Sequence, residues 1–251
     1  MLAAVDESSA SITLPMDAYV YSPEEWVAVS AANAYLIEDC VRAQGRPLRE
    51  FHGDFEVREE RPYGPWVMKS AEVNGWERGT VRTIAGRYDS GVRNNGEGDP
   101  DAYAAYQECE SNLTASGDLL AELLPGQIAG ETTVHGLIMM DANGLTAKDP
   151  EYREINWQWL DCVKSEGLTP DPSNGDWGVA VGNSSREQQI RDAVKDVRCK
   201  QKHSVMQRLS DIEAQYQAAL MASKEAPLAE LAKTKQDALA NASKVLAEHG
   251  A

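Results

Sequence analysis

The spacing of apolar positions along the chain predicts a mainly α-helical protein. In several stretches apolar residues recur every three or four positions, which places them on one face of a helix. The first stretch begins at Ser22, where Ser22, Pro23 and Glu25 match a capping box with proline in the first turn, and it continues to about Gln44. We therefore expect a long helix with one buried face here.

Two further helices are predicted where an aspartate precedes a proline. Asp99 can cap a helix that reaches about Ser116, and Asp149 can cap one that continues through Cys162 and Val163. The short apolar run at residues 134–140 fits either a helix or a strand, and its pattern does not decide between them.

A long C-terminal helix is predicted over residues 183–251, with Ser184 or Ser185 as its cap. Its apolar positions from Ile190 to Leu220 lie about 3.75 residues apart on average, which favours a straight helix on a helical body over a left-handed coiled coil. Pro227 removes a backbone hydrogen bond and clashes with the preceding turn, so we expect a kink or break near residues 223–227.

Residues 46–98 break the helical pattern. Glycine, proline, arginine and glutamate are frequent there, and short extended pieces at residues 50–57 and 80–88 could form a small hairpin. The segment is also rich in aromatic side chains. These are Phe51, Phe55, Tyr63, Trp66, Trp76 and Tyr88.

Two interpretations of these rings stay open. They could form a ligand platform, for which the candidate binding residues are Tyr63, Trp66 and Trp76, together with Trp177. Alternatively, they pin the irregular segment onto the helical body, which is the commoner case because aromatic rings bury a large area wherever they lie. We favour the second interpretation, in which Trp66 and Trp76 are mostly buried.

These elements give a simple expected layout. Residues 1–13 are small and polar and are expected to form a mobile tail, with ordered structure beginning at Leu14 and Pro15. Residues 14–182 are expected to form a helical domain tied by disulfides, which includes the irregular segment 46–98. Residues 183–251 form the C-terminal helix packed on that domain.

A short sequence repeat suggests how the helices are held together. Residues 34–45 read AYLIEDCVRAQG and residues 156–167 read NWQWLDCVKSEG, so both copies carry Asp-Cys-Val followed by a glycine four positions later. Each copy is typical of the last turns of a helix, closed by a glycine in the left-handed conformation.

The cysteine count indicates disulfides. The four cysteines are widely separated, lie on predicted helices and match no zinc spacing, which favours two disulfides and an oxidising compartment. Because duplicated geometry should give duplicated bonding, we predict Cys40–Cys109 and Cys162–Cys199. The pairing Cys40–Cys162 is the main alternative.

Charge argues against a nucleic-acid partner. The 251 residues carry a formal net charge of −16, which repels phosphate at long range. The acidic residues concentrate in the first three quarters of the chain, whereas a local basic cluster lies in the C-terminal helix. We expect this helix to pack against the acidic remainder. The cluster consists of Lys195, Arg198, Lys200, Lys202 and Arg208.

No sequence motif of a known catalytic centre is present. The chain lacks a nucleophile elbow, a P-loop, a dinucleotide fingerprint and a zinc-protease helix, so no catalytic residue, metal or cofactor is predicted. His203 lies one helical turn beyond Cys199, but a disulfide at Cys199 would leave the pair without a nucleophile. Carboxylates are too abundant to identify a glycosidase-type pair.

Several segments together resemble a family of uncharacterised secreted or lipid-anchored actinobacterial proteins. The segments are LPMDAYVYSPEEW at residues 14–26, DCVRAQG at 39–45, RPYGPW at 61–66, DPEYREINWQWLDCVKSEG at 149–167 and AVKDVRCKQK at 193–202. The resemblance implies an exported helical protein and assigns no catalytic residue. Family members begin with an export signal, often with a lipidated cysteine. Residues 1–15 lack such a signal, and we expect a leader or lipid tether to have been removed.

The expected function is therefore that of an extracytoplasmic, non-enzymatic binding or adaptor protein of the bacterial cell envelope. Its partner would be an envelope protein or a cell-wall ligand, and no segment is apolar enough to span a membrane. The alternative is an enzyme that acts on cell-wall glycan or peptide through carboxylates near the aromatic residues 51–88. A pocket with two facing carboxylates in a ring-lined cleft would favour the enzyme.

Overall fold

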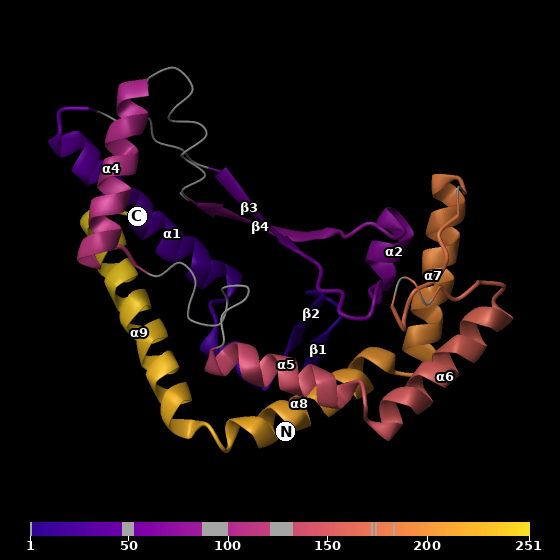
Figure 1. The fold of residues 1–251 in the computed structure, drawn as a ribbon. Helices are drawn as coiled ribbons and strands as arrows, with labels where there is room; N and C mark the ends of the chain where they lie inside the picture. Colours follow the sequence, from indigo (N-terminus) through magenta and orange to yellow (C-terminus); the bar gives the residue numbers. More distant parts are fainter. Residues whose placement is uncertain are drawn as a thin grey trace. The chain divides into compact units, whose positions relative to one another are not determined.

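The computed structural model describes residues 2–46, 53–86, 100–120, 133–171, 173, 175–182 and 184–251, and this part of the chain is mainly helical (Figure 1). The chain divides into two compact units, each made of three separate segments. Unit 1 contains Met1–Asp17, Arg58–Arg82 and Gly136–Glu225, and unit 2 contains Ala18–Val57, Thr83–His135 and Ala226–Ala251. The division differs from the expected one at residue 183, because the C-terminal helices contribute to both units.

The N-terminal residues, for which a mobile tail was expected, form a hairpin in unit 1. Strands β1 (Ala4–Asp6) and β2 (Ser11–Thr13) pair antiparallel, with Val5 opposite Ile12. The backbone N–H of Ala3 donates to Asp211 Oδ1 at 2.9 Å, and Ile12 is buried in the core. A few long-range contacts of this kind order a segment whose composition alone suggests mobility.

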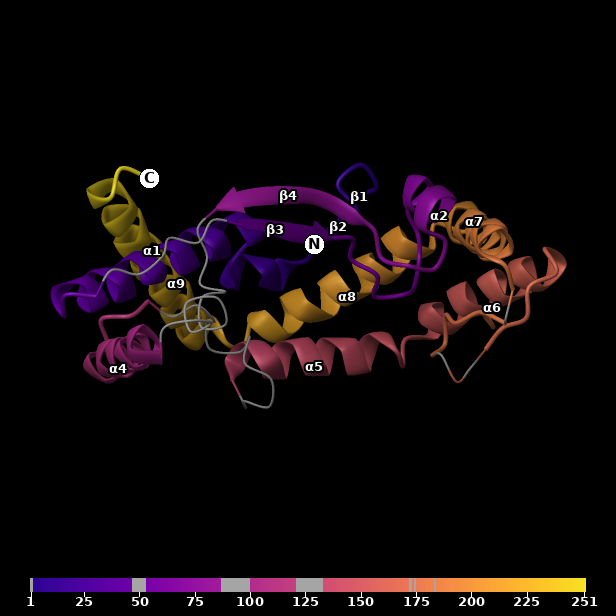
Figure 2. The ribbon, with the colours of Figure 1, turned by 90° about the horizontal axis from the view of Figure 1, so that it is seen from above.

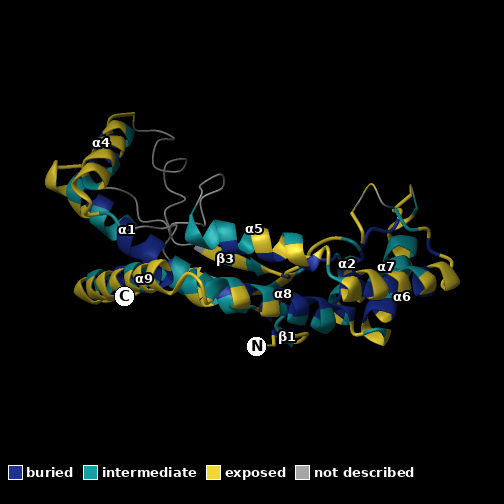
Figure 3. Cartoon of the chain, turned by 60° about the horizontal axis from the view of Figure 1, so that its bottom comes forward, coloured by how far each residue is buried: buried dark blue, intermediate teal, exposed yellow. Residues whose placement is uncertain are grey.

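The other elements of unit 1 surround a core of aromatic and aliphatic side chains. Helix α2 spans Met68–Asn74, α5 Val134–Thr146, α6 Pro150–Ser165, α7 Arg186–Lys202 and α8 Val205–Met221. The run at residues 134–140 is thus helical, and α2 lies where the sequence predicted none. Trp159, Ile155 and Leu209 are fully buried at the centre of the core, and Figure 3 shows the buried positions along α6, α7 and α8 in dark blue.

The C-terminal region consists of three helices instead of one helix with a single kink. The predicted break near Pro227 is confirmed: α8 ends at Met221 and α9 (Glu225–Glu248) carries Pro227 in its first turn. A second break separates α7 from α8 at His203 and Ser204. Ser204 has a φ of 50°, a left-handed conformation that ends the straight helix.

Unit 2 is built from α1 (Pro23–Ala43), α4 (Pro100–Ser116) and α9. The capping box at Ser22 and Glu25 is formed as the sequence predicts. One face of α1 packs with α4, and another places Val29 and Ala32 against α9. The expected cap Asp99 lies outside the described residues. A 3₁₀ turn, η1 (Pro15–Tyr19), precedes α1.

The two extended pieces predicted in the irregular segment form a two-stranded sheet, with α2 in the connection between them. Strands β3 (Gly53–Arg58) and β4 (Thr80–Gly86) pair with each other and lie side by side in Figure 2. The remaining parts of residues 46–98, at 47–52 and 87–98, lie outside the described residues, and Phe51 and Tyr88 are among them.

The sequence repeat closes one helix in each unit by the same backbone arrangement. After α1 the N–H of Arg46 donates to Val41 O and the N–H of Gly45 to Arg42 O, with Gly45 at a φ of 77°. After α6 the N–H of Leu168 donates to Val163 O and that of Gly167 to Lys164 O, with Gly167 at 79°. Both are Schellman motifs, in which glycine avoids the cost of a left-handed residue.

Each copy of the repeat also carries one disulfide. Cys40 of α1 is bonded to Cys109 of α4 within unit 2, and Cys162 of α6 is bonded to Cys199 of α7 within unit 1. The predicted pairing is therefore confirmed. Each bond joins the end of one helix to the next cysteine-bearing helix, and Figure 1 shows α6 and α7 side by side.

Candidate ligand-binding site

The aromatic residues proposed as a platform lie in or against the core of unit 1. Tyr63, Trp66 and Trp177 are buried, and Trp76 is half-buried against the same core. The ring of Trp177 lies 5.8 Å from that of Tyr63 and 5.3 Å from that of Trp159, measured between centroids. These rings fill the interior, which supports the interpretation that they pin the irregular segment to the helices.

Trp177 belongs to a chain of hydrogen bonds that leads from the core to the exposed Asp176. Its Nε1 donates to Tyr152 Oη at 2.9 Å, and Tyr152 Oη donates to Asp176 Oδ2 at 3.0 Å. Burial raises the pKa of Tyr152 to about 12, so the hydroxyl keeps its proton over the physiological range. The indole N–H of Trp177 and the hydroxyl of Tyr152 thus both have hydrogen-bond partners within the protein.

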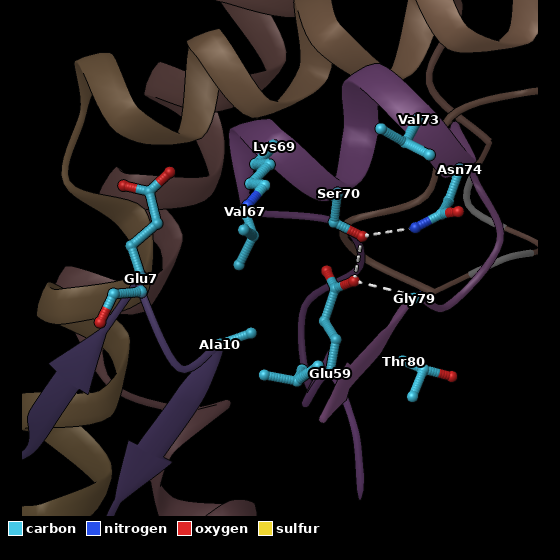
Figure 4. Close-up of a pocket in the computed structure, with 12 residues that line it drawn as sticks. Glu7, Ala10, Glu59, Val67, Lys69, Ser70, Val73, Asn74, Gly79 and Thr80 are labelled. Carbon is cyan, nitrogen blue, oxygen red and sulfur yellow. Dashed lines mark hydrogen bonds between the residues drawn. The ribbon is translucent and has the colours of Figure 1, made fainter. Parts of the chain in front are cut away.

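A pocket of about 510 Å³ opens in unit 1 between the N-terminal hairpin, α2 and the start of β4 (Figure 4). Its polar and apolar groups come from three separate stretches of the sequence, residues 7–10, 59–74 and 79–81. The lining residues are Glu7, Ser8, Ala10, Glu59, Val67, Lys69, Ser70, Val73, Asn74, Gly79, Thr80 and Val81.

Glu59 anchors the polar wall of this pocket. Its side chain is 1% exposed, and its Oε2 accepts hydrogen bonds from Ser70 Oγ and from Arg61 Nη2, the latter at 2.9 Å. Arg61 Nε lies 2.8 Å from Glu59 Oε1, close enough for an ion pair although the N–H is not aligned for a hydrogen bond. Arg61 Nη1 also donates to Trp76 O at 2.8 Å, which ties the wall to the irregular segment.

Asn74 and Gly79 complete this wall. Asn74 Nδ2 donates to Ser70 Oγ at 3.3 Å, and the N–H of Gly79 donates to Glu59 Oε2 at 3.4 Å. A Cβ at position 79 would lie 2.6 Å from Asn74 Nδ2 and 2.9 Å from Ser70 Oγ. An alanine at this position would therefore displace the side chains of Asn74 and Ser70.

The rest of the lining is more apolar. Val67, Val73 and Val81 contribute methyl groups, and Lys69 places an exposed ammonium group at the rim. Glu7 Oε1 accepts hydrogen bonds from the N–H of Met68 and from Gln201 Nε2, at 3.1 and 2.8 Å. Glu7 thus joins the hairpin to α2 and α7.

A second buried polar cluster lies at α7, apart from this pocket. Lys200 Nζ donates to Asp196 Oδ2 at 2.7 Å and to Pro65 O at 3.0 Å, and Trp159 Nε1 donates to Asp196 Oδ1 at 2.7 Å. Burial lowers the pKa of Lys200, and the charge of Asp196 acts against this shift. Two residues of the basic cluster predicted in the C-terminal region form ion pairs within unit 1. Lys200 forms one with Asp196, and Arg208 Nη2 lies 3.1 Å from Glu151 Oε1.

Cys199 and His203 cannot act as a catalytic cysteine–histidine pair, because the sulfur of Cys199 is in a disulfide and is not a free thiol. Burial lowers the pKa of His203, with Lys202 and Arg208 adding to the effect. In the described part of the chain, no three histidine, cysteine or carboxylate side chains gather closely enough to hold a metal ion. No helix among the described residues has the length and apolar character needed to cross a bilayer.

Sequence reasoning did not find the pocket residues. Glu59 and Arg61 lie in a run of charged residues, 58–61, which is typical of a solvated surface, yet both side chains are buried. Ser70 and Asn74 lie on α2, which was not predicted. Comparison of the chain with protein-family models, with curated proteins and with solved structures gave no match. The resemblance to secreted or lipid-anchored actinobacterial proteins therefore stays a prediction.

Proposed function

We propose that this chain is an extracytoplasmic, non-enzymatic binding or adaptor protein of the bacterial cell envelope, and that it binds a small organic ligand in the pocket of unit 1. The observation that carries the proposal is the pocket itself. Its volume of about 510 Å³ falls in the range of small-molecule sites, and its polar wall is already fixed by the contacts among Glu59, Arg61 and Ser70.

The state of the pocket carboxylates favours binding over catalysis. A general acid or base must exchange a proton with the substrate, and a nucleophile needs such a base beside it. Glu59 already accepts hydrogen bonds from Arg61, Ser70 and the N–H of Gly79, and Glu7 accepts from Met68 and Gln201. The lining residues include no aromatic ring, and the two carboxylates among them, Glu7 and Glu59, already accept hydrogen bonds within the protein, whereas the enzyme alternative expected a ring-lined cleft with two facing carboxylates.

The lining also indicates what the ligand would look like. Valine methyl groups favour an apolar surface on the ligand, and the Asn74 side chain and the exposed Lys69 ammonium favour hydrogen-bonding or anionic groups elsewhere on it. Soluble fragments of the cell wall, which combine amide, hydroxyl and carboxylate groups with short apolar side chains, meet this description.

Two disulfides support the extracytoplasmic part of the proposal. Disulfides persist in oxidising compartments and are rare where thiols are kept reduced. The described residues contain no cysteine outside the bonds Cys40–Cys109 and Cys162–Cys199.

A thermal-shift screen tests the proposed ligand class. The disulfide-intact protein is heated with a panel of soluble muropeptides and wall disaccharides, and a ligand should raise the melting temperature by binding the folded state alone. Val73→Trp fills the pocket from its rim, where Val73 is 61% exposed, and should abolish the shift. Val181→Trp is the matched control, because Val181 is 44% exposed and does not line the pocket.

The proposal predicts a shift that survives Val181→Trp and is lost in Val73→Trp, with the ligand recovered unchanged after incubation. An equal rise in melting temperature in both variants would show that the ligand binds outside this pocket. Conversion of the ligand by the wild-type protein would restore the enzyme alternative.

A further inference from the structure

The two disulfides differ in how easily a reagent in solution can reach them. In unit 2, Cys40 on α1 is half-buried, whereas its partner Cys109 on α4 is fully buried. In unit 1, Cys162 and Cys199 are both buried in the aromatic core. Thiol–disulfide exchange begins when a thiolate reaches one sulfur of the bond, so access favours attack on Cys40.

The sulfur of Cys109 is placed to leave in such an exchange. When one sulfur of a disulfide is attacked, the other departs as a thiolate. Gln44, at the C-terminal end of α1, donates from its Nε2 to Cys109 Sγ at 3.4 Å, and this hydrogen bond stabilises the negative charge that forms on the departing sulfur. Within the described ranges, no donor forms a hydrogen bond with the sulfur of Cys162 or Cys199.

The disulfide of unit 2 also holds a helix with limited packing. Helix α4 packs chiefly on α1, through a small cluster in which Ile37 and Val41 contact Ala105 and Tyr106 around Cys109. In unit 1, by contrast, α6 and α7 both pack on α8 as well as on each other, and α7 also packs on α2. Opening of the bond in unit 2 therefore removes a larger part of what holds its helices together.

Two polar features weaken the contact between α1 and α4. The hydroxyl oxygen of Tyr106 is buried, and no described residue forms a hydrogen bond with it, which costs folding free energy. Arg46 Nη1 lies 3.3 Å from Asp101 Oδ2, but both side chains are exposed and water screens this ion pair. The contact between the two helices thus depends strongly on the covalent bond.

We propose that Cys40–Cys109 is an exchangeable disulfide, which a dithiol reductant opens by attack on Cys40 to release α4 from α1. Cys162–Cys199 is then the structural disulfide of the chain. The proposal assigns a redox-sensitive switch to unit 2. It uses neither the pocket of unit 1 nor its ligand, and therefore does not depend on the proposed function.

The exchange balances with a dithiol as the sole co-reactant. One thiolate of the reductant bonds to Cys40 Sγ, the Cys40–Cys109 bond breaks, and its electron pair leaves on Cys109 Sγ. The second thiolate of the reductant then attacks the mixed disulfide, which releases Cys40 as a thiolate and closes the reductant into a cyclic disulfide. The protein gains two electrons, and two protons when both thiolates are protonated.

Timed reduction of the folded, full-length protein tests the difference between the two bonds. The protein is treated with dithiothreitol near neutral pH without denaturant, and samples are alkylated at intervals and mapped. Cys40 and Cys109 should become alkylated at least about tenfold faster than Cys162 and Cys199. Equal rates, faster opening of the bond in unit 1, or no opening of either bond in the folded protein would each overturn the proposal.

The direction of attack is tested with a monothiol. Glutathione with an acid quench should trap a mixed disulfide on Cys40. Gln44→Ala removes the donor to Cys109 Sγ and should slow opening about threefold or more. Gln107→Ala, on the exposed face of α4, is the matched control with an unchanged rate, because Gln107 Nε2 donates to Tyr103 Oη. Glutathione on Cys109, or equal rates in the two variants, would contradict attack on Cys40 with Cys109 leaving.

Hydrogen exchange tests the release of α4. It is measured in dithiothreitol at a time when the bond of unit 2 is open and that of unit 1 is intact. Backbone amides of α4 should exchange at least about tenfold faster than in the oxidised protein, whereas those of α6 and α7 should be unchanged. Unchanged protection of α4 would show that packing alone holds the helix and would overturn the proposed switch.

Discussion

Lys200 and Asp196 form an ion pair that is enclosed in unit 1. The Nζ and Oδ2 atoms lie 2.7 Å apart, and the side chains are 1% and 0% exposed. Lys200 Nζ also donates to Pro65 O, and Trp159 Nε1 donates to Asp196 Oδ1, so each partner has a second hydrogen bond within the core. The charge of each partner depends on the other, because neither reaches water.

Removal of Lys200 should therefore destabilise the protein strongly. In Lys200→Met the Asp196 carboxylate stays buried without its partner, which typically costs about 3–5 kcal/mol of unfolding free energy. Urea unfolding at neutral pH, followed by tryptophan fluorescence, measures the loss. Lys244→Met is the matched control, because Lys244 is exposed on α9. A cost no larger than that of the control would show that the pair is not enclosed in solution.

Glu213 should make the stability of unit 1 depend on acid pH. Glu213 is 8% exposed, and burial raises the pKa of its carboxyl above the usual value for a glutamate, with Asp17 adding to the shift. Gln217 Nε2 donates to Glu213 Oε1, which acts against the shift. The stability that the protonated form provides is complete below the unfolded pKa and is lost as pH rises through the folded pKa.

Glu213→Gln should thus stabilise the protein at pH 7, because it removes a buried charge and keeps an oxygen that accepts from Gln217. The gain should shrink as the pH falls and vanish once Glu213 is protonated in both states. Thermal unfolding from about pH 4 to pH 8 gives this profile. Glu72→Gln, at an exposed glutamate of α2, is the control. A stabilisation that does not change with pH would contradict the burial argument.

Two glycines allow a matched test of the pocket wall. Gly79→Ala would place a Cβ 2.6 Å from Asn74 Nδ2, which must move and would release Ser70. Gly144→Ala meets nothing within 4 Å and lies inside α5. We expect Gly79→Ala to lower the unfolding free energy and weaken any pocket ligand, and Gly144→Ala to raise the unfolding free energy by up to about 1 kcal/mol. Equal effects at both positions would show that the wall does not need glycine.

Local signals in the sequence were sufficient for most helices. The caps at Ser22, Asp149 and Ser185 and the closing glycines Gly45 and Gly167 are used as expected, because these backbone arrangements depend on a few adjacent residues. The disulfide pairing also followed from the sequence, since the repeat duplicates both the helix end and its cysteine.

Contacts between distant segments were not predictable in this way. The N-terminal hairpin is held by Asp6, which accepts from Ser8 and Ser9, and by the distant Asp211. The turn residues were visible in the sequence, but the partner on α8 was not. No glycine or proline marks the helix break at Ser204. The sequence signals it only through the long spacing between the apolar residues Val197 and Val205.

The pocket could not be predicted from the sequence for a related reason. Glu59, Ser70 and Gly79 come from three short segments around α2, and no periodic pattern connects them. A buried glutamate is recognisable only when its arginine partner and its donors are known, because the same residue type is normally exposed.

Peptide mapping without reduction tests the central claim, a pair of disulfide-tied helix units formed in an oxidising compartment, most directly. The protein is recovered from the envelope or medium of an exporting host, treated with an alkylating reagent and digested. We expect no alkylated cysteine and two cross-linked peptides, one joining Cys40 to Cys109 and one joining Cys162 to Cys199. A peptide joining Cys40 to Cys162, or four alkylated thiols, would contradict both the architecture and the proposed location.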